Sequence, residues 1–114
     1  MMIGLMLAHW VGDFLLQSSW MALEKSRSIL ALSAHVGTYG LVILVWSLFV
    51  TSPLVAIQFV AVNMALHFVI DSVTSRLTTY FRHQDNQRAM FSTIGFDQWL
   101  HFVCLYVTAQ KYLV

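Results

Sequence analysis

Residues 53–75, PLVAIQFVAVNMALHFVIDSVTS, decide the fold, because they are apolar along almost their whole length. A bilayer core of about 30 Å is crossed by about 20 apolar residues in a helix that rises about 1.5 Å per residue. Other stretches before and after this one meet the same requirement. Together they predict transmembrane helices over about 2–23, 29–50, 54–78 and 92–113.

The composition of the 114-residue chain agrees with this membrane class. Hydrophobic residues make up 59% of it and charged residues 10%, whereas soluble domains are about 25% charged. This composition excludes a soluble globular enzyme and a disordered chain, and the net charge of +1 excludes a nucleic-acid partner bound through a basic face. The lone Cys104 excludes an internal disulfide and a cysteine-based zinc cluster. We therefore expect one all-α transmembrane domain over residues 1–114.

Short connections between the predicted helices indicate an up-down-up-down four-helix bundle. Ser52 and Pro53 suit the capping position and the first position of the third helix. The first apolar run contains His9 and Asp13, which argues against a cleavable signal peptide. The first and third connections are richer in basic residues than the opposite side, which places them in the cytoplasm. Those basic residues are Lys25, Arg27, Arg76, Arg82 and Arg88.

Ionisable residues interrupt the apolar stretches, at a cost of about 2.5–3.5 kcal/mol each on insertion scales. Three of the helices carry a histidine and an aspartate four residues apart, so both side chains of a pair lie on one helix face. The second helix carries a lone histidine instead. The pairs are His9 with Asp13, His67 with Asp71, and Asp97 with His101, and the lone histidine is His35.

The order within each pair predicts that these residues form one site. Histidine comes first in the two paired helices that run toward the cytoplasm, and aspartate comes first in the helix that runs away from it. The up-down arrangement therefore places one layer of histidines beneath one layer of aspartates. Counted at about 1.5 Å per residue, these groups fall within roughly 5–22 Å of the cytoplasmic surface. The histidine layer is His9, His67 and His101, and the aspartate layer is Asp13, Asp71 and Asp97.

Three imidazoles that converge from different helices are the ligand set of an open catalytic zinc site. Carboxylates one turn away can serve as hydrogen-bond partners of the histidines, as ligands of a second metal, or as the base that takes a proton from water. His35 completes the ligand set or hydrogen-bonds the substrate. We therefore predict a divalent metal, preferentially zinc, held by His9, Asp13, His35, His67, Asp71, Asp97 and His101.

Two further residues are predicted to bind the substrate. Gln17 extends the polar face of His9 and Asp13 by one turn. Arg76 lies at the cytoplasmic mouth of the site, where basic side chains suit anionic head groups or phosphate. Two metal-free interpretations of the His/Asp pairs stay open, namely hydrogen bonds that hold the bundle together and a proton relay.

Three motifs also carry a resemblance to a known family. They are HWVGDFLLQ at 9–17 with Trp20, Lys25 and His35 after it, HFVID at 67–71, and DQWLH at 97–101. These motifs resemble those of small bacterial and phage inner-membrane proteins that are grouped as a domain of unknown function. The resemblance covers nearly the whole chain. It implies four transmembrane helices in a bacterial inner membrane and no particular activity.

A second likeness is confined to the third helix. His67-x-x-x-Asp71-x-x-Thr74 is similar to one motif of the predicted membrane-bound metal-dependent hydrolases. The two other motifs of those proteins, Asp-x-Asp-His and His-Arg-Gly-x-Thr-His-Ser, are absent from this sequence. The shared motif therefore favours metal binding more than it favours hydrolysis.

Two hypotheses of different classes follow. The first is an integral-membrane metal-dependent hydrolase of a lipid-linked or membrane-proximal substrate, with Asp13 or Asp71 as the catalytic base that activates water. The second is a non-enzymatic phage- or host-encoded membrane protein that conducts ions or protons, forms a holin-like pore, or fixes an assembly. The expected partner is membrane lipid, and four short helices also suit a homo-oligomer with the site near an interface.

Overall fold

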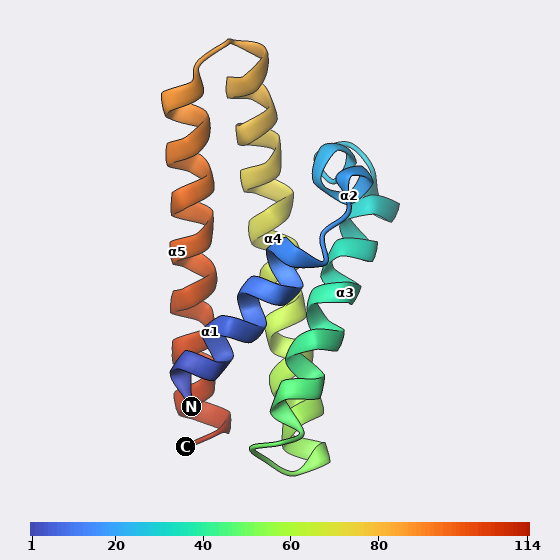
Figure 1. Ribbon diagram of the computed structural model, residues 1–114, viewed down its shortest axis with the longest axis vertical. Coiled ribbons are helices and arrows are strands. Elements are labelled where there is room, and N and C mark those ends of the chain that lie inside the picture. The colour runs from blue at the N-terminus through green and yellow to red at the C-terminus, as the bar shows by residue number, and fades with distance from the viewer.

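The structure is a computed structural model that describes residues 1–114, and it contains helices and no strands. The predicted all-α class is therefore confirmed. Three long helices run roughly along the long axis of the molecule, while α1 crosses them obliquely and α2 lies near the start of α3 (Figure 1). The elements are α1 (Met2–Trp10), a π-helical turn (Val11–Leu15), α2 (Ser19–Glu24), α3 (Ile29–Ser47), α4 (Pro53–His83) and α5 (Gln87–Tyr112).

The first predicted helix, over 2–23, is interrupted in the structure. The backbone N–H of Leu16 donates to the carbonyl oxygen of Val11, five residues earlier, at 2.9 Å, which is the hydrogen bond of a π-helix. A new helix then begins, because the Ser18 hydroxyl accepts a hydrogen bond from the N–H of Met21 at 3.2 Å and caps α2. Met2–Leu15 is about 21 Å long at about 1.5 Å per residue, which is less than the thickness of a bilayer core.

The other helix ends follow from local capping. Ser52 caps α4 and Pro53 occupies its first turn, as the sequence predicts. However, α4 runs on to His83 and α5 begins at Gln87, so the polar connection is much shorter than predicted. The polar residues after the apolar stretch do not end the helix, because arginine and glutamine are good helix formers. The turn itself uses Asp85 in a left-handed conformation with φ of 54°.

Two helices are long and apolar enough to cross a membrane. They are α3 and α4, whose most apolar segments have mean hydropathies of 1.8 and 1.9. The helix α5 is 26 residues long, but Asp97, Gln98 and His101 interrupt its middle.

The molecule buries as many polar side chains as hydrophobic ones. Its hydrophobic core lies toward the end where both termini are found and includes Leu5, Ile43 and Phe59. The polar side chains are buried further along the helices, and many large hydrophobic side chains face outward, among them Ile3 and Val69 at 85% and 61% exposure. The buried polar residues are His9, Asp13, His35, Ser47, Asn63, His67, Asp71, Thr74, Ser75, Asp97, His101 and Thr108.

One polar pair joins α4 to α5 away from the histidines. The Asn63 amide donates to the Thr108 hydroxyl at 2.9 Å, and both residues are buried. Interhelical hydrogen bonds in membrane proteins contribute about 0.6 kcal/mol on average and about 1.7 kcal/mol at most. We therefore expect Thr108→Val, which keeps the side-chain shape, to lower the unfolding free energy by about 0.6 kcal/mol in detergent. A loss of several kcal/mol in the unfolding titration would contradict this minor role.

Candidate metal centre

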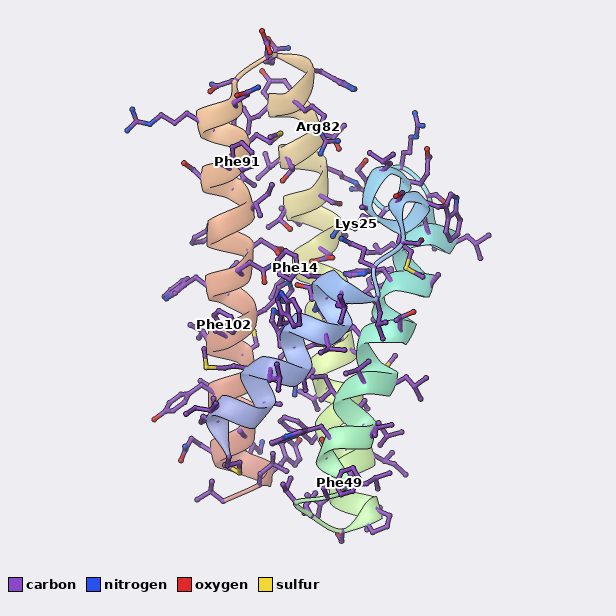
Figure 2. All side chains as sticks on the ribbon, in the orientation of Figure 1. Phe14, Lys25, Phe49, Arg82, Phe91 and Phe102 are labelled. Carbon is purple, nitrogen blue, oxygen red and sulfur yellow. The ribbon has the colours of Figure 1, made fainter.

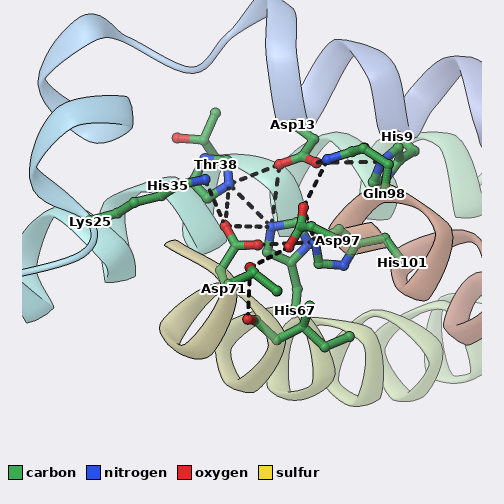
Figure 3. A network of polar contacts seen from close by, with 12 residues as sticks. His9, Asp13, Lys25, His35, Thr38, His67, Asp71, Asp97, Gln98 and His101 are labelled. Atoms are coloured by element: carbon green, nitrogen blue, oxygen red, sulfur yellow. Dashed lines mark hydrogen bonds and ion pairs between the residues drawn. The ribbon is translucent and has the colours of Figure 1, made fainter. Parts of the chain in front are cut away.

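Histidine and aspartate side chains from four parts of the chain converge at one level of the bundle (Figure 3). The π-helical turn, α3, α4 and α5 each contribute to the cluster, and each of these residues is at most 7% exposed. The residues are Asp13, His35, His67, Asp71, Asp97 and His101.

The central group consists of Asp13, His35, His67 and Asp71, whose nearest ligand atoms all lie within 4.8 Å of one another. The Nε2 atom of His35 is 2.9 Å from Asp13 Oδ1 and 3.1 Å from Asp71 Oδ2. The Nε2 atoms of His35 and His67 are 3.1 Å apart. Two imidazole nitrogens and two carboxylates thus face the same small space, and such a set of buried donors could hold a metal ion.

A second group of donors adjoins the first. Asp97 and His101 join Asp13 in another set whose ligand atoms lie within 4.8 Å of one another, so Asp13 is common to both groups. The Nε2 atom of His101 is 3.2 Å from Asp97 Oδ2 and 3.0 Å from Asp71 Oδ1. The Thr74 hydroxyl donates to Asp97 Oδ1 at 2.5 Å and holds that carboxylate in place.

Aromatic stacking fixes the ring of His67. Its centroid lies 4.0 Å from that of Tyr39 and 4.0 Å from that of His101, with interplanar angles of 26° and 14°. Tyr39 is itself buried on α3. A donor whose ring is packed in this way loses little further rotational freedom when it binds a ligand.

The position of Asp13 depends on the residue before it. Gly12 packs so closely against α3 that a Cβ atom placed on it would lie 3.2 Å from the Cα of Tyr39. The π-helical turn and this close approach together bring the Asp13 carboxylate to within 2.9 Å of His35 on α3. Gly12 is therefore a positioning residue that the sequence reasoning did not identify, although it lies within the first motif.

Two further polar residues complete the cluster. The Lys25 ammonium donates to Asp71 Oδ2 at 3.0 Å and is 18% exposed. The Gln98 amide donates to Asp13 at 3.1 Å and to Asp97 at 2.9 Å, and its oxygen faces His9 Nε2 at 2.9 Å. From the sequence, Lys25 is assigned chiefly to topology and not to the donor cluster. Gln98 gave no signal except its place beside Asp97 in the third motif.

Arg27, the next basic residue after Lys25, stays at the surface. Arg27 pairs with Glu24 at 2.6 Å, and this contact lowers the pKa of the Glu24 carboxyl. Of the two basic residues that follow the first apolar run, only Lys25 therefore enters the cluster.

Three predicted site residues belong to neither group of converging donors, namely His9, Gln17 and Arg76. His9 contacts Asp13 at 3.4 Å but belongs to neither set of converging donors, because the oblique α1 directs it toward α5. His35, which is expected from the sequence to complete the ligand set or to hydrogen-bond the substrate, lies in the central group. Gln17 is half-buried and lines a pocket next to the cluster, whereas Arg76 is exposed and does not line that pocket.

The carboxylates of the cluster outnumber its permanently charged basic groups. Three buried carboxylates carry three negative charges, and Lys25 supplies one positive charge at 3.0 Å from Asp71. Unpaired buried carboxylates are costly, so the remaining charge requires either two protonated histidines or a bound divalent cation. Imidazole and carboxylate donors together suit zinc, manganese or iron.

The fold and the site define an all-helical protein with a buried histidine and aspartate cluster that could hold a metal ion. The model of a family described as protein of unknown function (DUF3307) matches residues 1–114, and the chain belongs to this family. This membership agrees with the predicted resemblance to a family of unknown function and assigns no activity. No curated protein and no solved structure is detectably similar to the chain.

Proposed function

We propose that the chain crosses a bacterial inner membrane as a four-helix bundle, in which α1 with its π-helical turn and α5 join the two long apolar helices. The distribution of polarity supports this arrangement, because hydrophobic side chains face outward and polar side chains are buried. The basic residues near α2 and the α4–α5 turn favour the cytoplasm for that end. The first helix stops short of the bilayer thickness, so α2 lies at the interface with Trp20 as an anchor.

The cluster then serves as an intramembrane site for one divalent metal ion, with zinc as the preferred ion. The observation that carries this proposal is the charge balance of three buried carboxylates with a single ammonium. A divalent cation brings the sum to zero without requiring any histidine to be protonated. Asp13, His35, His67 and Asp71 are the donors that we assign to it.

The chemistry that this centre supports best is hydrolysis of a lipid-linked or membrane-proximal substrate. A bound divalent ion supplies Lewis-acid activation of water. Asp13 is the base that we favour for receiving the proton, because its Oδ1 faces the central donors while its Oδ2 points away from them toward Gln98, and because Asp13 lines the adjoining pocket whereas Asp71 does not. Asp71 instead contacts Lys25 and His101 at 3.0 Å and is assigned a holding role.

Metal content tests this proposal directly. The full chain, purified in dodecyl maltoside without chelators, is expected to retain about one divalent ion per chain by inductively coupled plasma mass spectrometry. His67→Ala and His35→Ala are expected to lose the ion, because both remove a central donor. His83→Ala is the matched control, since His83 is exposed at the end of α4. A metal-free wild-type protein that remains folded would contradict the metal centre and with it the hydrolase.

A second candidate is a metal-free proton path, and a specific observation favours it. The Nδ1 atoms of His9, His35 and His67 are buried without a hydrogen-bond partner, while the Nε2 atom of each faces an oxygen. Histidines that bind metal through Nε2 usually donate a hydrogen bond from Nδ1. The Nε2 atoms of His35 and His67 are 3.1 Å apart, so one of them donates and the other accepts, and together with the carboxylates they form a chain of polar groups.

Proton flux into liposomes separates the two candidates. A conducting protein would acidify the vesicle lumen under an imposed potential, and Asp71→Asn would abolish the flux because it removes the charge that His35 and His101 contact. Flux without bound metal supports conduction and rejects the enzyme. Bound metal without flux supports the metal centre.

A further inference from the structure

A polar pocket of about 180 Å³ adjoins the cluster on the side of α2. Two of its residues, Asp13 and Asp97, belong to the candidate metal centre. Lys25 and Arg82 also line it, and Figure 2 shows both of them between α4 and the α2 segment. Hydroxyl groups complete the lining along α4, from Thr74, Ser75, Thr78 and Thr79.

Buried polar atoms in this pocket lack partners. Ser75 is 7% exposed, and its hydroxyl is buried with no hydrogen-bond partner. The side-chain oxygen of Gln17, another lining residue, is also buried and unpartnered. Such groups are costly unless a ligand or ordered water satisfies them, so their presence in one pocket indicates a polar occupant.

The charges in the pocket indicate the sign of this occupant. Its lining carries two carboxylates and two basic side chains, and because a divalent ion and Lys25 together balance Asp13, Asp71 and Asp97, Arg82 leaves an excess of one positive charge. Arginine, lysine and hydroxyl groups are the donors that recognise phosphate. A water molecule occupies about 30 Å³ in the liquid, so the pocket holds a group of several waters' volume, which suits a phosphate but not a large head group.

We propose that this pocket binds the phosphate of a phosphomonoester, with Arg82, Lys25 and the Ser75 hydroxyl as its donors. The proposal rests on the proposed metal centre and names its substrate class. The phosphate would lie between the two ends of the pocket, attracted by the proposed metal ion at the Asp13 end and by Arg82 at the other. A lipid head group and free phosphate offer the same group, and the lipid is the source that the membrane location favours.

The test uses the full chain in dodecyl maltoside and two probes, dioctanoyl phosphatidic acid and inorganic phosphate. Metal content is measured on the same samples. Calorimetric titration is expected to show binding of the lipid, weakened about tenfold or more in Arg82→Gln and in Ser75→Ala, because a hydrogen bond to a charged group is lost in each. Arg88→Gln is the matched control, because Arg88 is exposed and does not line the pocket. Arg88→Gln removes one positive charge, as Arg82→Gln does, and should leave lipid binding unchanged.

The outcomes separate this inference from the metal centre. Equal weakening in Arg82→Gln and Arg88→Gln would show attraction by surface charge only and would overturn the pocket. Metal-loaded protein that binds neither probe would overturn the phosphate assignment while leaving the metal centre intact. Binding of inorganic phosphate as tight as that of the lipid would reject the lipid as the source. Absence of metal would be seen directly in the metal assay and would contradict the proposed centre.

Discussion

Asp71→Ala is expected to remove the bound metal and to lower the free energy of unfolding by about 3–5 kcal/mol, the cost of breaking a buried ion pair. The Asp71 carboxylate contacts Lys25 and His101 at 3.0 Å and His35 at 3.1 Å. Its removal leaves the Lys25 ammonium at 18% exposure without its partner. Metal content and thermal unfolding of the detergent-purified protein measure the two effects.

The double variant Lys25→Met/Asp71→Leu serves as the control for this prediction. Replacing both members of a buried ion pair by hydrophobic residues is often neutral or stabilising, so the double variant should recover most of the lost stability. It should still lack metal, because a donor is missing. Glu24→Ala, which breaks only the surface pair with Arg27, should change neither quantity. Wild-type stability in Asp71→Ala would show that the carboxylate is not held by these contacts.

Gly12→Val is expected to destabilise the protein by about 1–3 kcal/mol and to reduce metal binding, because overpacking forces the backbone to shift. A Cβ atom at Gly12 would lie 3.2 Å from the Cα of Tyr39 and 3.4 Å from the Cβ of Val42. The π-helical turn must therefore move away from α3, and Asp13 moves with it. Unfolding in detergent and metal content by mass spectrometry measure the two consequences.

Gly37→Ala is the matched control, since no atom would lie within 4 Å of a Cβ at that position. Alanine is more favourable than glycine in a helix by about 0.5–1 kcal/mol, so this variant should be as stable as the wild type or more so. Equal behaviour of Gly12→Val and Gly37→Ala would mean that the close approach of the π-helical turn to α3 has no role in forming the site.

Spacing along each helix predicted much of the cluster. A separation of four residues places His67 and Asp71 on one helix face, and the opposite order in Asp97 and His101 matches the opposite direction of α5. The structure brings these residues together as predicted. Residue spacing and helix direction were enough for that prediction, without knowledge of how the helices pack. Their role as metal ligands stays a prediction.

The remaining features of the site depend on backbone geometry and on long side chains. Hydropathy marks where a chain leaves lipid, not where hydrogen bonding changes, so it could not reveal the π-helical turn before Leu16 or the continuation of α4 to His83. The oblique course of α1 also leaves His9 outside both groups of converging donors, although it was predicted in the same histidine layer as His67 and His101. Lys25 reaches the cluster through a flexible side chain from outside the apolar run, which residue spacing does not describe.

The donors of the cluster lie far apart along the chain, from Asp13 in the π-helical turn to His101 in α5. During translation, the ribosome therefore completes the cluster only when it has made the last helix. Until then, the aspartates of the earlier segments have no complete set of partners, which would be costly in the membrane-spanning arrangement proposed above. On the proposed function, the assigned metal donors all precede α5, but the contacts of Asp71 and Asp97 with His101 form only with this last helix, so a truncated chain is expected to be less stable and more readily degraded.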